Sequence, residues 1–173
     1  MRAGVVALRF RGEWTHKVDA KGRVSVPAPF RRGLEAIDGW AEGAPVPMVA
    51  VKNQDRRACL NCYTLDEMAK IDDEVASLPR FSKERDVLSA LLAAGSDNVA
   101  LDDNGRFGIT AEMREKTGIT DQAVFVGMTD SFQIWSPEGY AAHKANMLEW
   151  LQAPDAPDDL FVLMRAAQEK YAQ

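Results

Sequence analysis

Short alternations of apolar and polar residues recur over the first three quarters of the chain and predict β-strands. The segments EWTHKV, DNVAL and SFQIWS alternate in this way, and turn-forming residues bound each of them. A period of two is typical of strands with one buried face. The pattern predicts strands over 13–18, 23–27, 47–53, 58–65, 97–101, 106–110, 123–128 and 131–136.

Longer segments show the 3.6-residue period of amphipathic helices. They cover 28–37, 64–78, 81–95, 111–119, 137–151 and 158–173. Helix starts are expected at Leu65 and at Pro137, where Ser136 provides an N-cap and the proline occupies the first helical position. Pro79 separates the two central helices. Strands and helices together predict an α+β fold.

The chain repeats itself. VDAKGRVSVPAPFRRGL from Val18 matches LDDNGRFGITAEMREKTGI from Leu101 at a spacing of 83, and CYTLDEM from Cys62 matches IWSPEGY from Ile134 at a spacing of 72. The first copy therefore has 11 extra residues, which we expect in the Gly- and Pro-rich stretch DGWAEGAPVP. Because an isolated hairpin is marginal in water, the two copies are expected to pair within one core.

Charge is unevenly distributed along the chain. The whole sequence has 21 Lys and Arg against 26 Asp and Glu, a net charge of −5. Residues 1–32 contain eight basic and two acidic groups, so this segment is at +6 and the other 141 residues are at −11. A basic segment on an acidic chain suits an anionic partner that is bound locally.

The segment DAKGR lies at the centre of this basic region and allows three interpretations. In the first, Gly22 provides a positive φ for a turn, while Asp19 caps the turn amides and pairs with Arg23. The second is nucleotide phosphate binding, but the spacing of a P-loop is missing. In the third, Lys17, Lys21 and Arg23 project from a hairpin that enters the major groove of DNA as a two-stranded ribbon.

Other classes of function find little support in the sequence. The chain has two histidines and no G-x-S-x-G, so no catalytic triad is identified and an enzyme is not expected. Cys59 and Cys62 lack two further ligands for zinc, and no metal or cofactor is expected. Three residues apart on a strand, they should face opposite ways, as packing or surface thiols in a reducing compartment.

No apolar run approaches the roughly 18 residues that span a bilayer, and the segment GVVAL near the N-terminus is too short for a secretory signal. A cytoplasmic protein is therefore expected.

The segments FRGEWTHKVDAKGRVSVPAPFR, LDDNGRFGITAEMR and FVGMTDSFQIWSPEGY strongly resemble the MraZ family of bacterial transcriptional regulators, over about Phe10 to Tyr140. The resemblance implies two tandem swapped-hairpin, AbrB-like β units that form a pseudo-dimeric barrel with flanking helices. It also implies a ring-shaped homo-oligomer such as an octamer. Such a ring would bind short direct repeats in double-stranded promoter DNA, associate with the nucleoid, and control the division and cell wall gene cluster, including its own promoter.

Within this frame the expected segments are an N-terminal extension (1–9), a first domain (10–80), a connecting helix (81–96), a second domain (97–150) and a C-terminal helix (151–173). The D-x-x-x-R motif of the family falls on Asp19 to Arg23 and on Asp102 to Arg106. The expected DNA-binding residues are Arg11, Lys17, Lys21, Arg23, Arg31 and Arg106. The residues expected to shape the loops are Asp19, Gly22, Asp102 and Gly105.

The second loop departs from the first, because Asp103 and Asn104 stand where the first has Ala20 and Lys21. Two alternatives to a DNA-binding regulator remain. One is an antitoxin-like or scaffold module that works through its acidic C-terminal helices, and the other is a redox or small-molecule sensor that uses Cys59 and Cys62.

Overall fold

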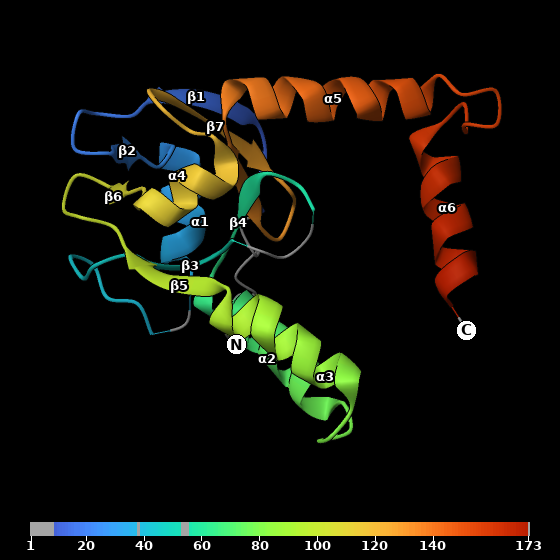
Figure 1. The fold of residues 1–173 in the computed structure, drawn as a ribbon, viewed down its shortest axis with the longest axis horizontal. Helices are drawn as coiled ribbons and strands as arrows, with labels where there is room; N and C mark the ends of the chain where they lie inside the picture. Colours follow the sequence, from blue (N-terminus) through green and yellow to red (C-terminus); the bar gives the residue numbers. More distant parts are fainter. Residues whose placement is uncertain (1–8, 38, 53–55, 173) are drawn as a thin grey trace, which may run out of the picture. The chain divides into compact units, whose positions relative to one another are not determined.

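Antiparallel strand pairs organise the computed structural model of the protein, which describes residues 9–37, 39–52 and 56–172 (Figure 1). The strands are β1 (Glu13–Lys17), β2 (Arg23–Ser25), β3 (Pro47–Val51), β4 (Cys59–Tyr63), β5 (Ser96–Ala100), β6 (Arg106–Gly108), β7 (Gln122–Gly127) and β8 (Phe132–Trp135). Six of them form one sheet in the order β1-β7-β8-β4-β3-β5, and β2 pairs with β6 in a second. The predicted strands and the α+β class are confirmed.

Pairs between the two copies alternate with pairs inside each copy along the larger sheet. β1 pairs with β7, β5 with β3, and β2 with β6. At the centre of the larger sheet Asn61 lies opposite Gln133, and in the smaller one Val24 lies opposite Phe107. Each of these pairs joins residues that the repeat makes equivalent, at spacings of 72 and 83. The two copies are therefore related by a local two-fold axis that passes through both sheets.

β1 and β5 are the two ends of the larger sheet, so the described strands do not form a closed barrel. What the structure shows is an interleaved, mostly antiparallel sheet system in which each copy completes the other.

The strand register also locates the extra residues of the first copy. Thr15 lies opposite Val124 and its equivalent Asn98 lies opposite Val49, so Val49 and Val124 are equivalent at a spacing of 75. Eight extra residues therefore precede β3, and three more lie between β3 and β4. The expectation that all 11 fall in 38–47 was wrong for these three. Residues 39–46 are irregular, as expected, and Asp38 is outside the described residues.

Helices follow the strands at equivalent points of each copy. α1 (Ala28–Glu35) and α4 (Ala111–Thr117) come after the paired strands β2 and β6. α2 (Leu65–Ser77) begins where predicted, with the Thr64 hydroxyl accepting a hydrogen bond from the Glu67 amide at 3.1 Å. α3 (Lys83–Leu88) continues into a π-helical segment, η1 (Ser89–Ala94), within the region predicted as one helix.

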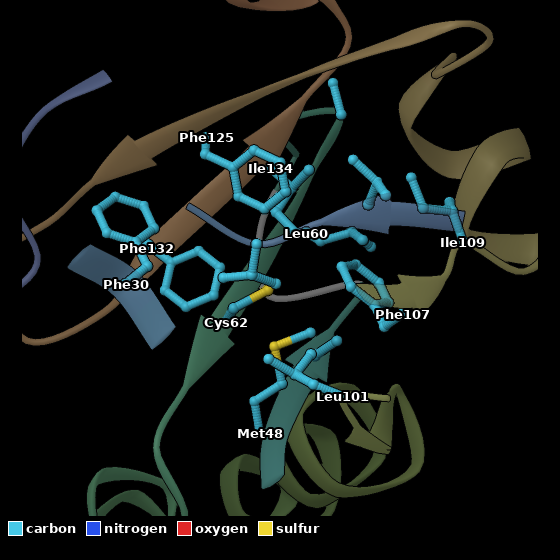
Figure 2. Close-up of a cluster of buried hydrophobic side chains, with 14 of the residues drawn as sticks. Phe30, Met48, Leu60, Cys62, Leu101, Phe107, Ile109, Phe125, Phe132 and Ile134 are labelled. Carbon is cyan, nitrogen blue, oxygen red and sulfur yellow. The ribbon is translucent and has the colours of Figure 1, made fainter. Parts of the chain in front are cut away.

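A single core contains side chains of both copies. Figure 2 shows Phe30 and Phe132 meeting in this cluster together with Leu60 and Ile134. The ring centroids of Phe30 and Phe132 are 4.9 Å apart, and those of Phe10 and Phe132 are 5.2 Å apart. Truncating a buried phenylalanine to alanine typically costs about 3–5 kcal/mol, so these contacts bind the copies to each other. A smaller cluster of Val49, Val51, Tyr63 and Met68 covers the other face under α2.

The chain divides into two compact units, Met1–Gly139 and Tyr140–Gln173. α5 (Pro137–Leu151) begins at the predicted proline and runs into the second unit, which also contains α6 (Leu160–Tyr171). Asp159 caps α6 by accepting a hydrogen bond from the Phe161 amide at 2.6 Å. None of the described helices is both long and apolar enough to span a membrane.

Candidate nucleic-acid interface

The first loop is built around the carboxylate of Asp19. One of its oxygens accepts hydrogen bonds from the amides of Lys21 and Arg23, each at 2.9 Å. The other accepts from Nε of Arg23 at 2.8 Å. Gly22 has a φ of 77°, and its amide donates to the Asp19 carbonyl at 2.9 Å. The loop therefore forms as predicted, and the carboxylate fixes the base of the Arg23 side chain.

These hydrogen bonds lower the pKa of the aspartate in each loop. The pKa of Asp19 lies below its usual value of 3.8, chiefly because the Arg23 amide donates to the ionised carboxylate. The pKa of Asp102 is lowered in the same way by the Arg106 amide. Both carboxylates therefore stay ionised through the physiological range and keep their arginines paired.

The second loop repeats the hydrogen bonds of the first. The carboxylate of Asp102 accepts from the amides of Asn104 and Arg106 at 2.9 and 3.0 Å, and from Nε of Arg106 at 3.3 Å. Gly105 has a φ of 71°. The change from Ala20 and Lys21 to Asp103 and Asn104 thus alters the charge of this loop without altering its conformation.

The ribbon of β2 and β6 brings the arginines of both loops to one surface. Arg23 lies opposite Gly108 and Ser25 lies opposite Arg106, while the alternate residues between them are buried. Paired residues share a face, so the two arginines are diagonal neighbours, whose separation is roughly 7–8 Å in such ladders. In Figure 1 the loops that lead into β2 and β6 extend from the same side of the first unit.

A hollow of about 510 Å³ lies on this surface. It is lined by Lys17, Val18, Asp19, Ala20, Arg23, Ser25 and Arg106. Three of the six predicted DNA-binding residues therefore meet in one place, and they come from both copies.

The predicted ribbon itself needs a correction. β1 and β2 were expected to form the hairpin that presents the basic residues, but a single bridge between Val18 and Val24 joins them. β1 pairs with β7 instead, and β2 finds its ladder partner in β6 of the other copy. The basic ribbon is thus shared by the two copies, because each short strand buries its apolar side against the opposite repeat.

The other predicted residues lie in different places. Lys21 is exposed at the tip of the first loop. Arg31 extends to the second loop, where its guanidinium lies against Gly105 and donates to the Asn104 carbonyl at 3.4 Å. Arg11 lies at the far end of β1, beside Gly127 and roughly 20 Å along the strand from Lys17.

Arg114 also belongs to this region, although it is not among the DNA-binding residues expected from the sequence. Its guanidinium lies against Gly22 of the first loop, and its Nε donates to the Ile109 carbonyl at 3.1 Å. The signal was present in the sequence, since Arg114 matches Arg31 at the spacing of 83.

The cysteines differ from their expected placement. They do lie on opposite faces of β4, with Cys62 in the main core and Cys59 beside Asn61. Both are buried thiols, however, so the idea of surface thiols was wrong, because both faces of the sheet are covered. Burial strongly raises the pKa of Cys62, which suppresses the reactive thiolate that a redox sensor needs. In the described part of the chain, no group of three or more His, Cys, Asp or Glu could hold a metal ion.

Fold and loops together define an α+β protein of two interleaved repeats with paired Asp–Arg loops on one surface. A family model described as "MraZ protein, putative antitoxin-like" matches residues 92–161. A protein named "Transcriptional regulator MraZ" from Ruegeria pomeroyi is 42% identical over 156 residues, 89% of this chain and 92% of that protein. One of the same name from Cereibacter sphaeroides is 40% identical over 158 residues, 87% of this chain and 94% of that protein. The chain belongs to the MraZ family.

Proposed function

We propose that this protein is a sequence-specific DNA-binding transcription regulator that reads double-stranded DNA with its two Asp–Arg loops. The single observation that supports this best is the hollow in which Lys17, Arg23 and Arg106 meet. Three cations on an otherwise acidic chain form a compact surface for a polyanion. The names of the curated relatives support a role in transcription.

Arg23 is the central contact in this proposal. Its Nε donates to Asp19, which leaves the terminal nitrogens of this partly exposed guanidinium for a ligand and reduces the freedom lost on binding. An arginine held in this way suits bidentate recognition of a guanine edge or a phosphate. Lys17, Lys21 and Arg106 would contact neighbouring phosphates and set the register of the loop on the duplex.

The remaining features of the proposal extend beyond one chain. The halves 10–80 and 97–150 would act as AbrB-like domains of a pseudo-dimeric barrel, and several chains would form a ring such as an octamer. One small loop makes few contacts, so its affinity is low and sensitive to salt. A ring that presents several loops to short direct repeats gains affinity through effective concentration. The targets would be the genes of the division and cell wall cluster, including the promoter of the protein's own gene. The protein would repress them in the cytoplasm, in association with the nucleoid.

The test compares Arg23→Ala with Arg80→Ala, an equal loss of charge at an exposed position between α2 and α3. We expect Arg23→Ala to bind the DNA upstream of its own coding sequence roughly 10- to 100-fold more weakly, because a base-contacting arginine is lost. Arg80→Ala should bind as the wild type does. Fluorescence anisotropy at several salt concentrations measures both, and light scattering checks that the oligomer is unchanged.

Wild-type affinity for Arg23→Ala would overturn the site. Equal binding of a scrambled duplex by the wild-type protein would overturn sequence-specific recognition.

A second candidate function is an antitoxin-like or scaffold module. It is favoured by the second unit, where large apolar side chains of α5 and α6 are exposed. They are Met147, Leu148, Trp150, Leu160, Phe161, Val162, Met164 and Tyr171. In this alternative the C-terminal helices would bind a protein partner and DNA contact would be secondary.

A further inference from the structure

Each loop is held by the opposite copy, and the two contacts are reciprocal. The Arg114 guanidinium of α4 lies where a side chain at Gly22 would project, and the Arg31 guanidinium of α1 lies in the same relation to Gly105. Arg31 and Arg114 are equivalent in the repeat. The first loop is therefore covered by the second copy and the second loop by the first.

Backbone hydrogen bonds make the same exchange. The Ile109 amide donates to the Gly22 carbonyl at 2.8 Å, and the Val26 amide donates to the Gly105 carbonyl at 3.0 Å. Ile109 also accepts the hydrogen bond from Nε of Arg114 through its own carbonyl. One connected unit across the two repeats thus contains Ile109, which follows β6, together with Arg114 and Gly22.

We propose that Arg114 is a positioning residue for the first loop: its guanidinium clamps the turn at Gly22 and so holds Arg23 in its outward orientation. The consequence for DNA rests on the function proposed above, but the clamp itself does not. Because Arg114 belongs to the second copy, the weakly charged repeat contributes to binding by holding its neighbour, and Arg31 performs the reciprocal task on the second loop.

The chemistry of the contact explains the residue types. Gly22 has a positive φ that favours glycine, and a Cβ at this position would displace the end of the Arg114 side chain from the turn. Arginine provides both the terminal guanidinium against the turn and an Nε donor to Ile109. Lysine has the charge but no Nε, so it cannot make the second contact.

The test uses hydrogen exchange on the full chain without DNA. The first loop contains the amides of Lys21, Gly22 and Arg23, which are protected by Asp19, and the second contains the equivalent amides 104–106. We expect Arg114→Ala to speed exchange roughly five- to tenfold in the first loop and to leave the second unchanged. Arg31→Ala should do the opposite. Lys116→Ala on the same helix, and Arg32→Ala next to Arg31, are the matched controls.

The conservative variant Arg114→Lys separates clamping from charge. We expect it to exchange like Arg114→Ala, since the Nε donor is missing in both. Wild-type exchange in Arg114→Lys would overturn the clamp, as would equal acceleration of both loops. Exchange in β8 reports whether a variant has lost its core, and if Arg114→Ala does not fold, Arg114→Lys supplies the same comparison.

DNA binding provides an independent readout. If Arg114 is a positioning residue, replacing it should lower the affinity for DNA. The slope of log K against log salt concentration should stay at its wild-type value. If Arg114 instead contacts a phosphate, that slope should fall by about 1 and the loop amides should exchange as in the wild type, which would overturn the proposal. Should Arg23→Ala bind DNA normally, the proposed function fails, and the exchange pattern still decides the clamp.

Discussion

At the residue scale, one short carboxylate controls each loop. Asp19 reaches two amides and the Nε of Arg23 because its side chain has a single methylene between backbone and carboxylate. Glutamate would place the carboxylate farther from the turn amides. The hydrogen bonds that shape the loop are therefore the same ones that orient the arginine.

Titration of Asp19 tests this arrangement. Since the folded pKa of Asp19 is depressed, its contribution to loop order is present at pH values above 3.8 and is lost as the pH falls through the folded pKa. We expect carboxyl NMR to place the midpoint for Asp19 below 3.8, with the amide protection of Arg23 lost over the same range. In Asp19→Asn that pH dependence should be absent. A midpoint at or above 3.8 would contradict the hydrogen-bonding scheme.

At the element scale, polar groups as well as apolar ones join the two copies. Lys52, at the end of β3, is buried and pairs with Glu112 of α4 at 2.7 Å and with Asp97 of β5 at 3.1 Å. The hydrogen bond that Lys52 donates to the Glu112 carboxylate is the chief cause that raises the pKa of Lys52 above 10.5. At the centre of the sheet, Nε2 of Gln133 donates to Oδ1 of Asn61 at 3.0 Å, on the local two-fold axis.

Lys52→Met retains the aliphatic packing and removes the ion pairs. We expect it to lower the free energy of unfolding by about 1 kcal/mol, because both carboxylates are open to water and are screened. Lys70→Met is the control, since Lys70 pairs with Glu67 at a similar 2.8 Å but on the surface. Urea denaturation measures both.

The ion pairs of Lys52 also make the free energy of unfolding depend on pH, in a direction set by the raised pKa of the lysine. A raised lysine pKa stabilises the fold fully below 10.5, and this contribution is lost as the pH rises through the folded value. The difference between wild type and Lys52→Met should accordingly be constant near neutral pH and shrink in strong alkali. If Lys70→Met costs as much as Lys52→Met, burial does not set the strength of the Lys52 pairs.

How much of this was predictable from the sequence depended on whether the information was local. Strand alternation, caps and turn glycines identified the elements, and Asp19 and Gly22 identified the first loop, because those signals lie within a few residues of each other. The partner of β2, the position of Arg31 and the clamp by Arg114 depend on which copy packs on which. The burial of Cys59 likewise depends on what packs over the second face of the sheet, and β4 alone carries no sign of that.

At the scale of the whole molecule, the shared core and the second unit have different roles. Phe30 and Phe132 join the repeats in one cluster, so the two Asp–Arg loops are supported by the unit Met1–Gly139. α6, by contrast, has no buried residue. A helix of 12 residues is marginal in water by itself, so its exposed apolar side chains are the feature that a protein partner would cover.

Deleting residues 152–173 separates the two proposed functions. If the protein is a DNA-binding regulator, the truncated chain should keep the affinity of each loop for a single short duplex within about twofold, because the loops and their clamps lie outside the deleted segment. Matched measurements on long and short duplexes report whether avidity is kept as well. Loss of binding to the single short duplex, with the thermal unfolding midpoint of the remaining chain unchanged, would assign the C-terminal helices a direct part in DNA binding.

The local two-fold axis also has a consequence for the polarity of the DNA site. A barrel made of two identical chains presents identical loops and is matched by a palindrome. Here the axis relates AKG to DNG, so the two sides of the ribbon have the same shape but different charge. A palindrome would place one of its two identical halves opposite the less basic loop. If the protein binds DNA as proposed, the best target of such a surface is a site that reads differently in its two directions, and several such sites in a row would all point the same way.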